Sequence, residues 1–415
     1  MTVRTLENGL RVVVVPCEAE SVAVGVFVAS GSRHETPATA GISHFIEHML
    51  FKGTARRSAL DITLAFEGRG GNFNACTGEE STCYYCHMPS ECLDEALDIL
   101  SDMYLHAKIG AKDFVREKAV IIEEIKMYAD EPDAVAMENL QKNLFPGLQL
   151  GEPVAGTPES LRPLKPADLK RYIKSHYRPD NTVVVIAGAV AEDTLARSLR
   201  PFERLKSAPS RSVDGLESGG FRIPPVREYV VRRDVQQAQL ALGYRTFGVS
   251  DPRKYALTVL DAVLGRGMSS RLFQEVREKR GLSYDIISRG QFFRDTGMFT
   301  IAAGLPADKC GAALAVIDRE LEKVCSKRIG AAELRRTKEF MIGNFRLGHE
   351  KVESKMFFYG STMLAFGRPV SPQEQIEGIR AVTAADVQAV AKAVFRPENR
   401  SVSWVLPKKG TSDDQ

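Results

Sequence analysis

The sequence has no hydrophobic run long enough to cross a membrane, since its longest apolar runs, such as residues 183–190, have the length of a strand. Its first eight residues contain no apolar stretch of the kind found in secretory signals. We therefore expect no membrane association and no export, and we expect a cytoplasmic location.

The sequence also lacks an excess of charge of either sign. Lys and Arg together number 56, Asp and Glu number 53, and the formal net charge is +3. So small a charge provides no general attraction to nucleic acid or to an anionic membrane surface. We expect neither partner. With 44% hydrophobic residues, the chain is too apolar to be disordered.

Cysteine is scarce, and the odd number of seven argues against a framework of disulfides. Cys83 and Cys86 have the C-x-x-C spacing of a zinc or redox pair. They lie, however, in a segment with the pattern of a strand, and no second pair of this spacing accompanies them. We interpret both as structural residues of that strand.

The chain contains an internal repeat. Residues 167–181 match residues 385–399 without a gap, 218 positions later, and residues 89–100 match residues 306–317 at an offset of 217. Two matches at nearly one offset predict two copies of one domain, residues 1–205 and 226–410. The Ser-, Gly- and Pro-rich stretch over residues 206–225 is the predicted linker.

Each copy mixes strands and helices. In the first copy, valine-rich segments predict strands at residues 11–16, 21–29 and 182–189, and residues 72–85 predict a strand or hairpin. Apolar spacing predicts helices at residues 40–51, 93–105 and 113–128. Adjacent strands followed by runs of helices favour an α+β fold, with helices packed on one face of a mainly antiparallel sheet.

The predicted helix at residues 40–51 carries a candidate metal site. His44 and His48 are four residues apart, so their imidazoles project from one helical face and can bind one Zn²⁺. Glu47 lies on the same face, within reach of a water molecule on the metal. Taken alone, the pattern also fits a helix with two solvated or hydrogen-bonded histidines.

A third ligand is available on the predicted helix at residues 113–128. Glu117 and Glu124 are seven residues apart and share one face, whereas Glu123 points about 100° away. Two histidines and one carboxylate, with an open fourth position, form the ligand set of a catalytic zinc site.

The motif His44-x-x-Glu47-His48, followed by Glu124 in a Glu-Glu-Ile segment, resembles the inverzincin zinc peptidases of the pitrilysin family, among them processing peptidases and their short bacterial homologues. The resemblance covers nearly the whole chain and includes residues 8–12, 31–35, 48–54, 74–77, 156–157 and 277–284.

This resemblance implies a zinc endopeptidase that hydrolyses short unfolded peptides. It implies that His44, His48 and Glu124 bind Zn²⁺ and that Glu47 is the general base for a metal-bound water. Glu117 would be a supporting acidic residue at the site. Asn74, Ala75 and Thr77 would belong to an edge strand that pairs with an extended peptide, although on sequence alone this segment also fits an ordinary core strand.

The second copy lacks these ligands, because no second His-x-x-Glu-His occurs in the sequence. It carries Arg277 and Tyr284 instead, which in the pitrilysin family reach the zinc site of a facing domain, bind the substrate backbone and stabilise the oxyanion. Without the resemblance they would be an ordinary surface arginine and a half-buried tyrosine. Because one chain resembles half of a full-length family member, we expect a homodimer. The alternatives are a non-catalytic subunit or a catalytic subunit that needs a different partner chain.

Overall fold

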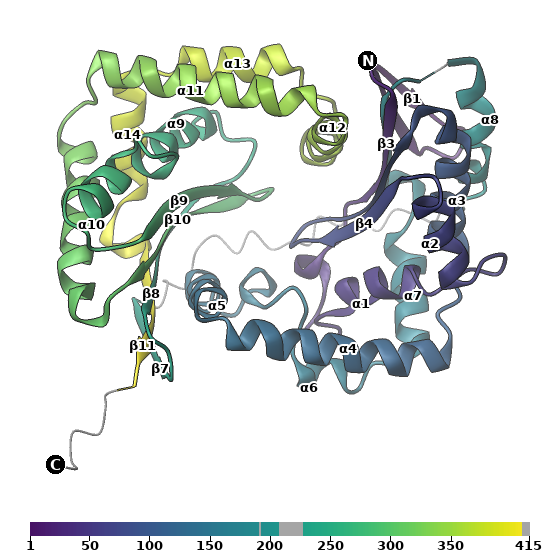
Figure 1. Ribbon diagram of the computed structural model, residues 1–415, viewed down its shortest axis with the longest axis horizontal. Helices are drawn as coiled ribbons and strands as arrows, with labels where there is room; N and C mark the ends of the chain where they lie inside the picture. Colours follow the sequence, from purple (N-terminus) through teal and green to yellow (C-terminus); the bar gives the residue numbers. More distant parts are fainter. Residues whose placement is uncertain (191, 207–226, 409–415) are drawn as a thin grey trace. The chain divides into compact units, whose positions relative to one another are not determined.

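The computed structural model describes residues 1–190, 192–206 and 227–408 (Figure 1). Their contacts form two compact units. The first unit comprises residues 1–125, 152–206 and 346–370, and the second comprises residues 126–151, 227–345 and 371–408. Apart from Lys206, the predicted linker at 206–225 lies outside the described residues, so the boundaries at 205 and 226 stay a prediction.

The first unit is built on a six-stranded sheet with the strand order β1-β2-β6-β3-β5-β4. All neighbouring strands are antiparallel except β2 and β6, which are parallel. The valine-rich strands β2, β3 and β6 are buried in the centre, whereas β4 is an edge strand. The strands are β1 (Thr2–Thr5), β2 (Arg11–Pro16), β3 (Ser21–Val28), β4 (Asn72–Thr77), β5 (Thr82–Pro89) and β6 (Thr182–Gly188).

Helices cover both faces of this sheet. One face packs against α1, α3 and α7. Among the described helices, the other face packs against α12, which lies beside β3 in Figure 1. Central strands with helices on both sides need apolar side chains on both faces, which explains their continuous valine runs. The helices along this part of the chain are α1 (Ile42–Leu50), α2 (Ala59–Glu67), α3 (Leu93–His106), α4 (Ala111–Asp130), α6 (Pro158–Leu161), α7 (Pro166–His176), α8 (Glu192–Glu203) and α12 (Val352–Phe366).

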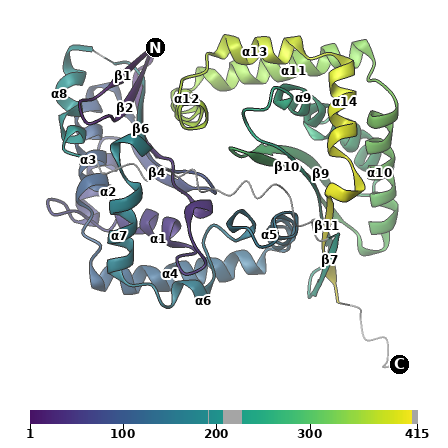
Figure 2. The same ribbon diagram turned by 180° about the vertical axis from the view of Figure 1, so that it is seen from behind.

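The second unit repeats this plan with a five-stranded sheet in the order β7-β11-β8-β10-β9. Only β7 and β11 are parallel neighbours. Figure 2 shows α5 on one face of the sheet and α9 and α14 on the other. The elements are β7 (Glu228–Arg233), β8 (Ala238–Phe247), β9 (Asp285–Phe292), β10 (Thr296–Leu305), β11 (Arg400–Pro407), α5 (Pro132–Leu144), α9 (Lys254–Gly265), the π-helix η6 (Phe273–Glu278), α10 (Cys310–Ser326), α11 (Ala331–Glu350), α13 (Pro372–Ala381) and α14 (Ala384–Val394).

The predicted α+β architecture is confirmed, with one addition. Helices α5 and α12 begin 220 positions apart, at Pro132 and Val352, and so occupy equivalent places in the two halves of the sequence. Each belongs to the unit whose sheet comes from the other half, and each covers the face that the remaining helices leave open. Among the described residues, no helix is long and apolar enough to cross a membrane.

Candidate metal centre

Helix α1 divides into a buried apolar side and a polar side. Its five large apolar side chains are at most 1% exposed and anchor the helix in the core of the first unit: Ile42, Phe45, Ile46, Met49 and Leu50. Because these residues determine how the helix is rotated, His44, Glu47 and His48 lie together on the remaining face, where each is partly exposed. The predicted helix is present over Ile42–Leu50, and the roles of the three polar residues stay a prediction.

Helix α4 brings Glu124 to the two histidines. The Nε2 atom of His44 lies 3.8 Å from Oε1 of Glu124, and Nε2 of His48 lies 3.4 Å from Oε2 of Glu124. One ligand atom from each of these three side chains lies within 4.8 Å of the other two, and no other such group occurs in the described part of the chain.

These separations are closer to those of ligand atoms around one zinc ion than to those of direct hydrogen bonds. They exceed the usual donor–acceptor distance of about 2.7–3.2 Å for a hydrogen bond. Ligand atoms placed about 2.0–2.2 Å from a tetrahedral ion are separated by roughly 3.3–3.6 Å. Two imidazole nitrogens and one carboxylate are also the donor set of catalytic zinc sites, which keep one position open.

The protonation of His44 suits metal binding. Burial, with a smaller contribution from His48, lowers the pKa of His44 to about 4. The imidazole is therefore neutral near pH 7, which is the form that coordinates a metal. No proton must then be removed from His44 before it can coordinate.

Glu117, on α4, supports the metal group through its contact with His48. Its carboxylate is 5% exposed and lies with Oε2 3.4 Å from Nδ1 of His48 and Oε1 2.9 Å from Nζ of Lys52. A carboxylate beside the second ring nitrogen orients the imidazole and raises its basicity toward a metal. The ammonium of Lys52 balances the charge of this buried carboxylate.

Glu47 is held by a neighbouring strand. The hydroxyl of Thr77, at the end of β4, donates a hydrogen bond to Oε2 of Glu47. Burial raises the pKa of Glu47, and the hydrogen bond from Thr77 partly opposes that rise. The environment thus moves the pKa of this carboxylate toward neutral pH, which favours acid–base catalysis.

The other predicted residues of β4 lie at the edge of the sheet. Asn74 is exposed, and its Oδ1 accepts a hydrogen bond of 2.8 Å from the backbone N–H of Ala75. β4 is the last strand in the sheet order, with β5 as its neighbour. In the described sheet it is therefore an edge strand and not an interior core strand. Thr77 contacts Glu47, whereas the side chain of Asn74 bonds to the backbone of its own strand.

Arg277 and Tyr284 lie together in the second unit. The guanidinium carbon of Arg277 is 4.8 Å from the ring centroid of Tyr284 and 4.7 Å from that of Phe273. Tyr284 is 78% exposed, so it is far more accessible than a half-buried tyrosine. Their predicted meeting with the zinc site of a second chain stays a prediction.

Two residues that support the candidate site, Glu35 and Lys52, were not predicted. The buried carboxylate of Glu35 accepts hydrogen bonds of 2.7 Å from the backbone N–H groups of Gly41 and Ser43, so it caps the first turn of α1. Gly41 has a φ of +89°, and a Cβ there would lie 2.6 Å from the carbonyl oxygen of Ala155. Lys52 was the second omission. Glu35 and Lys52 lie within segments that resemble the family, but their contacts leave no periodic signal.

The second unit has a buried ion pair at the position where the first unit has the candidate ligand His44. By the repeat offset of 217, His44 corresponds to Asp261 on α9. The carboxylate of Asp261 is buried, accepts a hydrogen bond of 2.6 Å from Ser288 and contacts Nε of Arg266 at 2.5 Å. These contacts satisfy the carboxylate without a metal.

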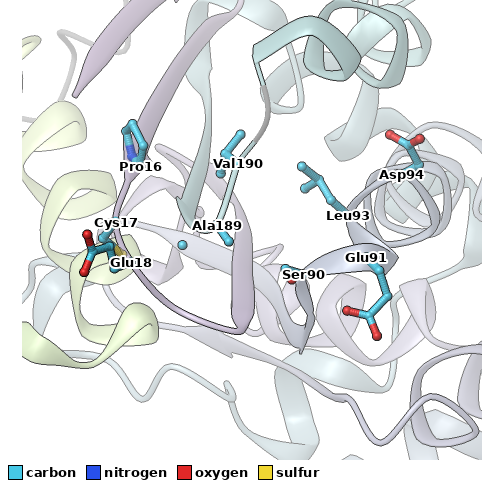
Figure 3. A pocket seen from close by; sticks show the side chains of 10 residues that line it. Pro16, Cys17, Glu18, Ser90, Glu91, Leu93, Asp94, Ala189 and Val190 are labelled. Atoms are coloured by element: carbon cyan, nitrogen blue, oxygen red, sulfur yellow. The ribbon is translucent and has the colours of Figure 1, made fainter.

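A hollow of about 760 Å³ in the first unit has a different character (Figure 3). Figure 3 shows Glu18 and Asp94 on opposite sides of it. None of its lining residues belongs to the metal group or to β4. Its polar side chains are three carboxylates, Cys17 and Ser90.

Comparison with known proteins agrees with this geometry. The family model described as insulinase (peptidase family M16) matches residues 11–158, and the model described as the M16 inactive domain matches residues 163–341. The chain is 37% identical to the Bacillus subtilis protein named uncharacterized zinc protease YmxG, over 97% of both chains. It is 36% identical to a Streptomyces coelicolor protein also named an uncharacterized zinc protease, over 98% of this chain and 89% of that protein.

The fold is also similar to that of a crystallised protease from Helicobacter pylori. That chain is 23% identical, with a TM-score of 0.91 that covers 98% of this chain and 99% of the other. The two matching domain models, the full-length relatives named zinc proteases and the clustered ligand set agree with one another. The chain therefore belongs to the M16, or pitrilysin-type, family of zinc peptidases.

Proposed function

We propose that the protein is a zinc-dependent endopeptidase that hydrolyses short unfolded peptides. The observation that carries this proposal is the grouping of His44, His48 and Glu124, whose ligand atoms lie within 4.8 Å of one another, with Glu47 beside the two histidines on α1. A Zn²⁺ ion held by these three residues would supply Lewis acidity and lower the pKa of a bound water.

The residues of the chain have distinct tasks in the proposed reaction. Glu47 accepts the proton of the attacking water and later returns it to the leaving amine. Thr77 holds the Glu47 carboxylate in one orientation through its hydrogen bond. Glu117, balanced by Lys52, holds the ring of His48. The contacts of Glu117 and Thr77 hold His48 and Glu47 in place, which supports a catalytic role.

We propose that the substrate binds as an added strand on β4. An edge strand offers backbone groups to an extended peptide, and such pairing tolerates many sequences. The N–H of Ala75 is held by the side chain of Asn74, so a peptide carbonyl would take the place of Asn74 Oδ1. Only an unfolded segment can present its backbone in this way.

The proposed active form is a homodimer. Arg277 and Tyr284 of one copy would bind the substrate backbone and stabilise the oxyanion at the metal centre of the other copy. The high exposure of Tyr284 and its packing with Arg277 support a role in binding. We further propose a cytoplasmic location.

Metal analysis joined to a peptide digest tests the proposal. The purified chain should bind one Zn²⁺ per chain, cleave members of a mixed peptide library and spare a folded protein. A chelator should abolish cleavage, and added Zn²⁺ should restore it, whereas His44→Ala should show neither zinc binding nor cleavage. A zinc-loaded chain that cleaves nothing would refute a self-sufficient enzyme. Recovery with a different chain would then support the heterodimer, and no recovery would support a non-catalytic subunit.

A further inference from the structure

Two free cysteines face each other across the hairpin that carries the substrate strand. Cys76 on β4 is the direct register partner of Cys83 on the antiparallel strand β5. Directly opposite residues have side chains on the same face and Cα atoms about 4.5–5.5 Å apart. That separation lies inside the range of about 4.4–6.8 Å found for disulfides.

The two thiols differ in environment. Cys76 is exposed, whereas Cys83 is buried in the apolar cluster between the sheet and α12. The hydrogen bond from Cys83 lowers the pKa of the Cys76 thiol, and burial raises the pKa of Cys83. Cys76 therefore has the character of the attacking thiolate and Cys83 that of a protected second thiol.

Cys86 does not compete for this role. It lies opposite Phe73 and belongs to the apolar cluster on the other face of the sheet. The C-x-x-C spacing of Cys83 and Cys86 thus places the two thiols on opposite faces of β5, so these two residues do not pair with each other.

We propose that Cys76 and Cys83 are a redox-active pair that a peroxide converts into a cross-strand disulfide. The Cys76 thiolate attacks hydrogen peroxide, gains one oxygen as a sulfenic acid and releases hydroxide. The Cys83 sulfur then attacks the Cys76 sulfur, and the sulfenic oxygen leaves as water with the proton of the Cys83 thiol. Two thiols are oxidised, and one peroxide is reduced to two molecules of water.

The pair is coupled to the metal centre through the next residue. Thr77 directly follows Cys76 and donates to Glu47. A disulfide fixes the χ angles of Cys76 and restrains the backbone of β4 beside Thr77, so we expect it to disturb both the Thr77 hydroxyl and the backbone proposed to pair with substrate. This consequence rests on the proposed function, whereas formation of the disulfide does not.

Peptide mapping tests the disulfide itself. After hydrogen peroxide and alkylation of the denatured chain, a protease that cuts after glutamate separates the two cysteines at Glu79 and Glu80. We expect peptides linked through Cys76 and Cys83, with Cys86 alkylated. In Cys83→Ala we expect no linked peptides, and dimedone should label Cys76. Free, alkylated Cys83 beside a Cys76 oxidised to sulfinic acid would overturn the proposal.

Peptidase assays test the coupling. Wild-type protein should lose activity with peroxide and regain it with a phosphine reductant, while Cys76→Ser should keep its own untreated rate under the same treatment. Linked peptides without loss of activity would overturn the coupling alone. If the untreated protein cleaves nothing, the proposed function fails while the mapping result still decides the redox pair.

Discussion

The hydroxyl of Thr77 donates a hydrogen bond to the carboxylate of Glu47. The two residues come from different elements, β4 and α1, so this contact ties the predicted substrate strand to the predicted general base. Thr77 thereby has a task beyond contact with substrate, because its side chain is already engaged with the residue that moves the proton.

Removal of this hydroxyl should shift the pH profile. The hydrogen bond stabilises ionised Glu47, so Thr77→Val should raise the pKa of Glu47 further. A base works only when ionised, and the rate falls as the pH drops through its pKa. The acidic limb of kcat against pH should therefore move to higher pH in Thr77→Val, and Thr77→Ser should retain the wild-type limb. An unmoved limb in both variants would contradict the contact.

Glu47→Gln should separate metal binding from catalysis. The amide keeps the size of the side chain but cannot accept the proton of the attacking water. We expect about one Zn²⁺ per chain and a loss of kcat of at least about 10²-fold, the scale of general acid–base catalysis. Zinc content and initial rates measured on the same preparation decide the matter, and a near-normal rate would refute the base assignment.

Lys52→Met should weaken zinc binding without removing a ligand. Its loss leaves Glu117 buried without its ammonium partner, so Glu117 holds the ring of His48 less firmly. Outer contacts of this kind typically change metal affinity by about 10–100-fold. Competition with a chromophoric chelator should show that loss, with Lys52→Arg between Met and wild type. Equal affinity in all three proteins would exclude a role for Lys52.

Glu35→Gln should change how stability depends on pH. Burial raises the pKa of Glu35 from 4.5 to about 7, against the opposing hydrogen bonds from Ser43 and Gly41. The folded protein thus keeps a proton that the unfolded chain releases above pH 4.5. The free energy of unfolding should fall as the pH rises from about 4.5 to about 7 and then level off.

The size of this effect is at most about 3 kcal/mol, because each unit of pKa corresponds to about 1.4 kcal/mol. Urea unfolding of both proteins between pH 5 and 8 measures it. The stability of wild type relative to Glu35→Gln should decline over this range, and a constant difference would argue against a protonated Glu35.

Tyr284→Phe should slow the reaction and report on the dimer. Loss of one oxyanion donor costs about 10²–10³-fold in kcat. If the site is shared between copies, an equal mixture of Tyr284→Phe and Glu47→Gln, unfolded and refolded together, should regain roughly a quarter of wild-type activity, since half of the dimers then hold one complete site. No recovery would indicate that each chain completes its own site or uses another partner.

Local patterns allowed the metal group to be predicted. The four-residue spacing of His44 and His48 determines their geometry as soon as the helix forms, and the apolar side of α1 determines which way they point. Glu124 could be chosen over Glu117 only through the resemblance to a known family, because both share one face of α4. The distances to His44 and His48 now distinguish them.

The sequence patterns could not predict contacts that form only when separate segments of the chain fold against one another. Glu35 reaches the first turn of α1 from a preceding loop, and Lys52, in the turn after α1, meets Glu117 on α4, so neither leaves a periodic signal. For a related reason, the sequence could not predict which sheet α5 or α12 covers. An amphipathic pattern indicates that a helix buries one side, but it does not indicate which sheet that side will meet.

The exchanged helices have a consequence during synthesis of the chain. All six strands of the first sheet are made before α12, so Val13, Phe27 and Val185 have no helical cover until residue 366 has left the ribosome. Helix α5, in turn, is made before any strand of the sheet that it covers. An incomplete chain exposes apolar surface and is prone to aggregate. The first sheet is thus covered on both faces only after α12 has been synthesised. A product that stops before Val352 should bind chaperones or be degraded by proteases.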